Sequence, residues 1–438
     1  MSAPAILALT LTASLLIGVP IAFSIGIATL VTLYFGGIPI AFLAQQSFTA
    51  LDSFPLMAVP YFILAGALME TGGLSSRIIN VAQEAMGNIT GGFGIVTILA
   101  CALFAAISGS SPATVAAIGS IMIPAMVERG YHKDFAAAVA GSGGGLGIVI
   151  PPSIPMIIYG IVAGVSIGDM FLAGFFPGFI LSVLMIVWIY ITAKKRGYTG
   201  TGEPFQLGRF FKSLWDAKWA LLAPVIILGG IYSGYFTPTE SAVIAVVYGL
   251  IIGLFVYREL KWSQIPQALI SSALVTGSVM VILGTATAFG KLVTMYQIPT
   301  LLANAMLNIS ENRFILLTLI VILILFVGTF METLSIIIIF APLFLPILIR
   351  LGVDPIHFGI LLVVGAEIGM MTPPLGVNLF VASGISGLPM ERVAKAIFPF
   401  VIVLTGGLLL MTYVPWISTV VPDTVKVIKA YFAAKGGA

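Results

Sequence analysis

Charged residues are scarce in this 438-residue sequence. Asp, Glu, Lys and Arg make up 8% of it, against roughly 25% in soluble domains. Hydrophobic residues make up 60%, and the mean hydropathy is +1.16. Apolar runs of about 17 to 25 residues recur from end to end, which is the length of a helix that crosses a bilayer. The sequence therefore predicts an all-α polytopic membrane protein, since a membrane β-barrel would show alternating strands of ~10 residues.

Cysteine and histidine are nearly absent. Cys101 is alone, which excludes an internal disulfide or a thiolate metal cluster. His132 and His357 lack ligand-like spacing, and we expect both in solvated loops. The net charge of +3 is too small and too dispersed to indicate nucleic-acid binding. The sequence carries no nucleophile triad, metal motif or phosphate-binding loop, so it predicts neither an enzyme nor an organic cofactor.

An internal repeat organises the chain. Residues 108–177 align with 330–399 without a gap, and the pair Pro151-Pro152 meets Pro373-Pro374. Further matches are mostly helix breakers and glycines: Gly143 meets Gly365, and Gly147 meets Gly369. Adjacent double prolines in one ungapped register make a chance match of Gly and Pro improbable, so we predict two copies of one scaffold.

Each copy divides into the same segments. The first repeat, 1–193, is expected to contain scaffold helices within 4–71 (4–17, 20–36 and 55–71), an arm at 73–90, a hairpin at 91–128, a broken helix at 134–165 and a helix at 171–193. A basic linker at 194–218 follows. The second repeat, 219–421, is expected to contain scaffold helices within 219–290 (219–235, 239–257 and 268–290), an arm at 291–312, a hairpin at 313–350, a broken helix at 354–385, a helix at 393–421, and then a tail at 422–438.

Polar residues in the centre of 91–128 and 313–350 indicate re-entrant hairpins. Ser111 followed by Pro112 is typical of an N-cap and a first helical residue. With both segments re-entrant, each repeat crosses the membrane five times, so the second repeat is inverted. Placing the linker in the cytoplasm puts thirteen of the 19 Lys and Arg residues on that side. We therefore expect both termini outside.

Inverted repeats with broken helices are typical of secondary transporters that bind substrate and ions near the midplane. Half-helix C-termini bind Na⁺ and half-helix N-termini attract carboxylates, which predicts two sodium sites with Na⁺ as the only metal. The first would comprise Ser108, Ser110, Ser111, Gly143 and Gly145. The second would comprise Gly328, Thr329, Thr333, Gly365 and Thr372. Alternatively, these small residues only let helices pack closely.

Candidates for substrate binding lie beside the same breaks. The prolines Pro151, Pro152, Pro373 and Pro374 are expected to hold the helices open. The candidates are Ser111, Thr114, Ser153, Glu332 and Asn378. Glu332 and Glu367 are the only acids in their apolar segments, which makes each a functional candidate. The alternative is that these carboxylates only orient a hairpin tip.

Four motifs carry a family resemblance. "DSFPLMAVPYFILAGALMETGG" (52–73), "SGSSPATVAAIGSIMIPAM" (108–126), "LGIVIPPSIPMIIYG" (146–160) and "GMMTPPLGVNLFVASGI" (369–385) closely resemble the large membrane subunit of tripartite ATP-independent periplasmic (TRAP) transporters. The resemblance covers essentially the whole chain. It implies a multi-pass protein of the bacterial inner membrane that imports an organic acid with Na⁺ by an elevator motion.

The resemblance also implies partners and site chemistry. The partners would be a small four-helix membrane subunit and a soluble binding protein that delivers substrate from outside. Members often have Thr at Gly145 and Asn at Gly365, so coordination here would depend more on main-chain oxygens. "GTFMETLS" and "AEIGMMTPPLGVNLF" are nearer to members that handle sialic or sugar acids than to C4-dicarboxylate members. A stand-alone Na⁺/anion symporter and a channel remain alternatives.

Overall fold

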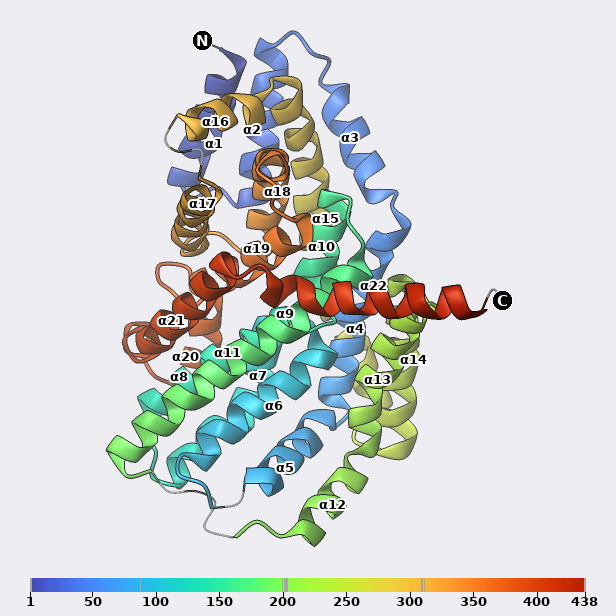
Figure 1. The fold of residues 1–438 in the computed structure, drawn as a ribbon, viewed down its shortest axis with the longest axis vertical. Helices are drawn as coiled ribbons and strands as arrows, with labels where there is room; N and C mark the ends of the chain where they lie inside the picture. The colour runs from blue at the N-terminus through green and yellow to red at the C-terminus, as the bar shows by residue number, and fades with distance from the viewer. Residues whose placement is uncertain are drawn as a thin grey trace.

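The protein is all-helical in the part of the chain that the structure describes. The computed structural model describes residues 2–86, 88–198, 200, 204–308, 310 and 312–436. Parts of four predicted segments lie outside the described residues: Gly87 and residues 309 and 311 of the arms, residues 199 and 201–203 of the linker, and residues 437–438 of the tail. Figure 1 shows an elongated molecule with the N-terminus near one end and α12 at the other.

The first half of the chain forms twelve α-helices and one short 3-10 turn among the described residues. They are α1 (Ala3–Leu16), α2 (Ile21–Phe35), α3 (Ala41–Leu51), η1 (Phe54–Met57), α4 (Ala58–Thr71), α5 (Leu74–Met86), α6 (Gly92–Ser108), α7 (Ser111–Glu128), α8 (Lys133–Gly143), α9 (Leu146–Val149), α10 (Ile154–Ala163), α11 (Ile167–Arg196) and α12 (Leu207–Asp216).

The second half follows a similar order. Its elements are α13 (Lys218–Ser233), α14 (Pro238–Ile251), η2 (Ile252–Val256), η3 (Trp262–Gln264), α15 (Ile265–Met295), α16 (Ile298–Leu307), α17 (Arg313–Gly328), α18 (Thr333–Arg350), α19 (Pro355–Gly369), α20 (Val377–Ser386), α21 (Met390–Tyr413) and α22 (Trp416–Gly436).

Prolines and polar caps define where several helices begin. Proline occupies the first or second position of α7, α10, α14 and α19, where the missing N–H is not needed. Asp354 accepts hydrogen bonds from the first backbone N–H groups of α19, and Thr237 forms a capping box with Glu240 at α14.

Two helical hairpins and two broken helices pack crosswise at the centre. The first hairpin (α6 and α7) contacts α20, which follows the double proline of the second half. The second hairpin (α17 and α18) contacts α10, which follows the double proline of the first half, through its helix α18. Both Pro151-Pro152 and Pro373-Pro374 are cis peptide bonds. Helices distant in sequence therefore meet around one central region.

Long apolar helices are consistent with a polytopic membrane protein. Within the residues that the structure describes, eight helical stretches are long and apolar enough to cross a membrane, or up to nine if the bent pair α12 and α13 forms one span. The bend in that pair is 60°. Shorter apolar helices of 10–17 residues include α1, α2, α6, α17, α19 and α20.

The structure differs from the sequence expectations at several points. The single helix predicted at 393–421 is wrong, because Pro415 separates α21 from α22. Helix α22 then continues through most of the predicted tail and crosses α11 (Figure 1). Helix α3 was not predicted, because its eleven residues are too few for a span. His357 is also not in a solvated loop: it is 1% exposed on α19, and its Nδ1 lies 2.6 Å from Ser418 Oγ.

Candidate functional site

The tip of the first hairpin docks on the double-proline break between α9 and α10. The carbonyl oxygen of Gly109 accepts a hydrogen bond from the Ile154 N–H at 3.3 Å. Gly109 has a φ of 61°, and a Cβ there would lie 2.9 Å from the Pro152 oxygen, so both the backbone conformation and the contact require glycine. Ser110 is the N-cap of α7, and the prediction of Ser111 for that role is wrong. The Ser111 side chain therefore extends to another helix.

The tip of the second hairpin docks on its own break by a similar backbone contact. The Leu375 N–H donates to the carbonyl oxygen of Thr329 at 2.8 Å. Gly328 packs directly on α19, since a Cβ on Gly328 would lie 2.9 Å from the Gly369 Cα. Glu332 occupies the N-cap position of α18 with an extended backbone. Each hairpin tip is thus fixed to a helix break through main-chain atoms.

A buried polar cluster joins the two halves of the chain. Ser111 Oγ donates to Glu367 Oε1 at 2.6 Å. Asn378 Nδ2 donates to Glu367 Oε1 and to Ser111 Oγ, both at 2.7 Å. The three residues are 1%, 2% and 0% exposed for Ser111, Glu367 and Asn378. This Ser111–Glu367–Asn378 cluster links α7 of the first hairpin to α19 and α20 of the second half.

The second carboxylate oxygen of Glu367 is unpaired. Among the described residues, Oε2 has no hydrogen-bond partner. A void of about 10 Å³ lies beside Ser142, Gly145 and Glu367, which is close to the space that one water molecule needs. An ionised carboxylate buried without a countercharge is costly. Glu367 therefore requires a cation or a proton.

A central cavity of about 460 Å³ lies between the two hairpin tips and the two breaks. Four helices begin at its wall, and their first residues line it: Ser111, Pro112 and Ala113 of α7, Ile154 and Pro155 of α10, Thr333 and Leu334 of α18, and Val377 of α20. The described lining contains Glu332 and Glu367 and no Lys or Arg. Helix N-termini carry a partial positive charge, so the cavity can hold an anion without a basic side chain.

Two further helices close the central cavity. Ile63 of α4 and Val275, Ser278 and Val279 of α15 form this wall. Helix α4 and most of α15 fall within the ranges that the sequence assigns to scaffold helices. The cavity thus lies between those helices on one side and the hairpins and broken helices on the other.

The residues predicted for the first sodium site are only partly brought together. Ser108 Oγ lies 2.8 Å from Thr114 Oγ1, which donates to the Ser110 carbonyl oxygen at 2.8 Å. Gly143 lies elsewhere: a Cβ on it would be 3.1 Å from Cys101 Sγ of α6. Gly145 faces the buried cluster, since its Cβ would be 3.0 Å from Glu367 Oε1. The first hairpin tip and Gly145 therefore lie beside Ser111 and Glu367, without Gly143.

The residues predicted for the second sodium site are dispersed. A Cβ on Gly365 would lie 2.9 Å from Ile324 Cγ2 of α17, so this glycine does not face the hairpin tip. The hydroxyls of Thr329 and Thr372 donate to carbonyl oxygens of their own helices, at 2.8 and 3.3 Å. Thr333 Oγ1 lies 2.8 Å from Met370 Sδ. Of the groups predicted to bind this ion, the main-chain oxygens near Gly328 are those that the contacts above leave as candidates.

The aligned glycines show why Gly143 and Gly365 lie away from the predicted sodium sites. Gly147 and Gly369 each pack on a hairpin tip: a Cβ on Gly147 would lie 2.5 Å from the Ser110 carbonyl oxygen, and Gly369 abuts Gly328. Gly143 and Gly365, the other aligned pair, face apolar side chains of α6 and α17. The repeat alignment contains both pairs. In each repeat, the second of these two glycines is the one that approaches the hairpin tip.

Two of the five substrate candidates line the central cavity, namely Ser111 and Glu332. Ser153 does not, because its hydroxyl donates to the Ile148 carbonyl oxygen at 2.6 Å and accepts from the Met156 N–H. Thr114 is engaged within the first hairpin tip, and Asn378 is fully buried behind Ser111. Sequence reasoning missed the role of Glu367 as the centre of the cluster, although its isolation in an apolar segment marked it.

Comparison with known proteins identifies the family. The fold and the cavity define a polytopic, all-α membrane protein of the transporter type. Residues 8–417 match the family described as "Tripartite ATP-independent periplasmic transporter, DctM component". The chain belongs to this family, whose named relatives are transporter permeases rather than enzymes.

Several similar proteins have names that state a substrate. The chain is 48% identical over 402 residues to the isethionate TRAP transporter permease protein DctMQ of Oleidesulfovibrio alaskensis, covering 92% of this chain and 63% of that relative's length. It is 43% identical over 381 residues to the C4-dicarboxylate permease DctM of Pseudomonas aeruginosa, covering 87% and 89%. It is 38% identical over 407 residues to the sialic acid permease SiaM of Vibrio cholerae, covering 93% and 95%.

Two solved structures share the fold. The Alcanivorax borkumensis YdaH transporter superposes with a TM-score of 0.63 at 17% identity, covering 86% of this chain and 87% of the other. Neisseria gonorrhoeae MtrF superposes with a TM-score of 0.61 at 14% identity, covering 87% and 85%. At these identities the likeness concerns the fold alone.

Proposed function

We propose that the protein is the large permease subunit of a Na⁺-driven importer of a small organic anion. The observation that carries this proposal is the convergence of four helix N-termini on one cavity of about 460 Å³ whose described lining contains no Lys or Arg. Such an arrangement favours a carboxylate or sulfonate at the centre of the protein. Its volume falls within the roughly 300–1,000 Å³ typical of small-molecule sites.

Na⁺ coupling is the second element of the proposal. The carbonyl ends of α6 and α17 lie at the hairpin tips, and Gly109 and Ser110 of the first tip line the cavity. Unwound carbonyls of this kind suit Na⁺. Glu367 supplies a buried negative charge next to the first tip. A cation bound there would neutralise Glu367 and reduce its repulsion of an anionic substrate. Substrate and Na⁺ would therefore bind more favourably together than separately.

Membership of this family supports a proposal about the partners of the protein and its location in the cell. We propose that a small membrane subunit and an extracytoplasmic binding protein work with this chain in the bacterial inner membrane. The inverted repeat and both termini outside remain part of the proposal, supported by the excess of basic residues on one side of the predicted topology. Movement of the hairpins and broken helices past α4 and α15 would carry the cavity across the membrane as an elevator.

The substrate is proposed as a small organic anion. The sequence of this chain is 48% and 43% identical to the isethionate and C4-dicarboxylate permeases, and 38% identical to the sialic acid permease. These relatives favour a short sulfonate or dicarboxylate over the sialic or sugar acid that the local motifs suggest. Isethionate and succinate are therefore the first probes.

Reconstitution tests the proposal. Proteoliposomes that contain this chain and its small subunit should accumulate the probe only with an inward Na⁺ gradient and with loaded binding protein outside. Uptake without the binding protein would instead indicate a stand-alone symporter. Flux that a Na⁺ gradient cannot drive uphill would indicate a channel.

A further inference from the structure

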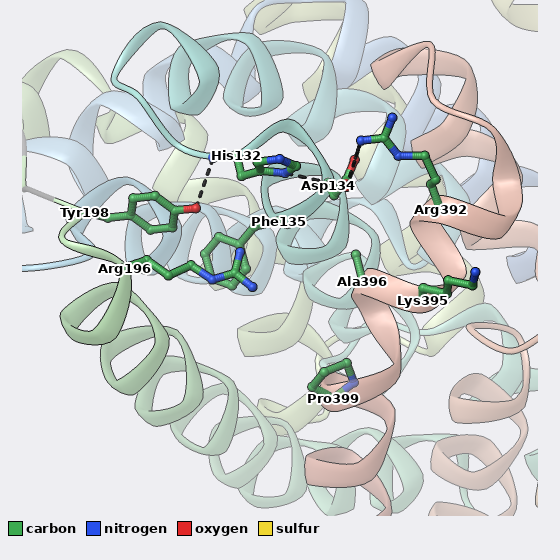
Figure 2. A pocket seen from close by; sticks show the side chains of 9 residues that line it. All are labelled: His132, Asp134, Phe135, Arg196, Tyr198, Arg392, Lys395, Ala396 and Pro399. Atoms are coloured by element: carbon green, nitrogen blue, oxygen red, sulfur yellow. Dashed lines mark hydrogen bonds and ion pairs between the residues drawn. The ribbon is translucent and has the colours of Figure 1, made fainter.

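A second hollow, of about 710 Å³, shares no lining residue with the central cavity (Figure 2). Its wall comes from three places distant in sequence: the start of α8, the end of α11 and the start of α21. We call it the basic hollow, because Arg196, Arg392 and Lys395 line it. The predicted topology, which places the linker 194–218 in the cytoplasm, puts all three on the cytoplasmic side.

Positive charge exceeds negative charge in the basic hollow. Its three cations face the single carboxylate of Asp134, which leaves a formal excess of two. Asp134 accepts two hydrogen bonds from Arg392 Nη2, at 2.8 and 2.9 Å, and lies 3.5 Å from His132 Nδ1. Arg196 and Lys395 form no ion pair with a carboxylate among the described residues. Two exposed cations are thus available to an anion.

Aromatic rings hold this arrangement in place. Arg196 lies over the Phe135 ring at 5.4 Å. Tyr198 stacks on Tyr131 with ring centroids 4.4 Å apart, and its hydroxyl accepts the His132 N–H at 3.1 Å. Figure 2 shows Arg196 and Tyr198 on one side and Arg392 and Lys395 on the other. The hollow is therefore formed by packed elements, and amphipathic aromatic residues of this kind are typical of the bilayer interface.

An apolar strip continues from the hollow along α21. Lys395, Pro399 and Ile402 follow one another at helical spacing, and Ile402 is 58% exposed. Phe398 on the neighbouring turn is 57% exposed. A ligand with a charged head and an apolar tail would match both parts.

We propose that the basic hollow binds the phosphate group of an anionic lipid headgroup, with the acyl chains along α21. Basic pockets between membrane helices on the cytoplasmic side bind such headgroups, and arginine pairs well with phosphate. The site differs from the central cavity in position and in chemistry, because it uses basic side chains. Inorganic phosphate shares the same recognition chemistry and is the other possible source.

Native mass spectrometry of the purified full-length chain tests the proposal. The probes are phosphatidylglycerol, phosphatidylcholine and inorganic phosphate. The double variant Arg196→Gln/Lys395→Gln should bind phosphatidylglycerol roughly tenfold more weakly. The control Lys194→Gln/Lys195→Gln removes the same charge from neighbouring exposed residues outside the lining, and it should retain wild-type affinity.

A second variant guards against a folding defect. Ala396→Glu leaves every cation in place and adds a carboxylate to the lining, so it should also weaken phosphatidylglycerol binding. If inorganic phosphate saturates the wild type and displaces phosphatidylglycerol, the hollow is a phosphate site whose ligand is a free anion and not a lipid. Equal phosphatidylglycerol affinity in the control and in both hollow variants would overturn the proposal, as would equal affinity for phosphatidylcholine.

Discussion

Ser111 Oγ and Glu367 Oε1 lie 2.6 Å apart although the residues are 256 positions apart in the chain. This hydrogen bond joins the start of α7, in the first hairpin, to the last turns of α19, in the second broken helix. Both residues also line the central cavity. A change in the charge of Glu367 can therefore reach the N-terminus of α7 at the cavity wall.

Ser111→Ala should weaken the response to Na⁺. The variant removes a donor to a buried carboxylate, and losses of this kind cost about 1–3 kcal/mol. We expect the Na⁺ concentration for half-maximal uptake to rise by roughly tenfold. Ser120→Ala is the matched control, because Ser120 lies on the same helix and its hydroxyl donates to the Ala117 carbonyl oxygen of that helix. A Na⁺ titration equal to the control would contradict the role of the Ser111 hydroxyl.

Glu367→Gln should keep the hydrogen bonds to Ser111 and Asn378 while removing the charge. We expect uptake to lose most of its dependence on the Na⁺ gradient, because the countercharge for the cation is gone. Glu391→Gln removes an exposed acid at the start of α21 and should behave as wild type. The measurement is initial uptake against Na⁺ concentration. An unchanged curve for Glu367→Gln would assign this acid to structure alone.

Gly109→Ala should disrupt the first hairpin tip. A Cβ at this position meets the Pro152 oxygen at 2.9 Å, in addition to the strain of a φ of 61°. Gly130→Ala separates these two effects, since Gly130 has a φ of 83° with nothing within 4 Å. We expect both variants to lose about 1–2 kcal/mol from the left-handed backbone, and Gly109→Ala to lose more. Equal thermal stability and equal transport in the two variants would rule out the contact with Pro152.

Ser418→Ala should loosen α22 from α19. The variant leaves both ring nitrogens of buried His357 without a partner, because Nε2 already has none among the described residues. Leaving such a group unpaired costs about 1–3 kcal/mol. Thr424→Ala, which removes an exposed hydroxyl from the same helix, is the control. We expect a lower unfolding temperature in detergent for Ser418→Ala, and equal values for the two variants would argue against the pairing.

Composition and breakers in the sequence were sufficient to predict the all-helical class, the hairpins and the double-proline breaks. Their signals are local: apolar runs, the Ser111-Pro112 helix start and paired prolines. The side-chain contacts were harder to predict from the sequence, because they depend on which face each helix turns toward its neighbours. One turn of α19 separates Gly365, which faces Ile324, from Gly369, which abuts Gly328, and glycine composition alone does not distinguish them.

The sequence expectations also missed the burial of His357 and the separation of α21 from α22 at Pro415. A lone histidine close after Asp354 and Pro355 is compatible with a loop, whereas in the structure α22 packs on α19 and places Ser418 against its ring. The basic hollow depends on tertiary contact as well, since Arg196 and Lys395 come from helix ends far apart in sequence. Neither the burial of His357 nor the basic hollow has a local signature in the sequence.

Labelling of a cysteine in the central cavity tests the central claim most directly. The single native cysteine, Cys101, is fully buried, so an introduced cysteine would be the accessible thiol. Ser278→Cys places one on the cavity wall of α15, and Ser271→Cys places the control on the same helix outside the lining. We predict that isethionate or succinate slows labelling at position 278 in Na⁺ but not in K⁺, and leaves position 271 unchanged. Labelling at 278 that neither anion slows in Na⁺, or that either slows equally in both salts, would contradict Na⁺-coupled anion binding in this cavity.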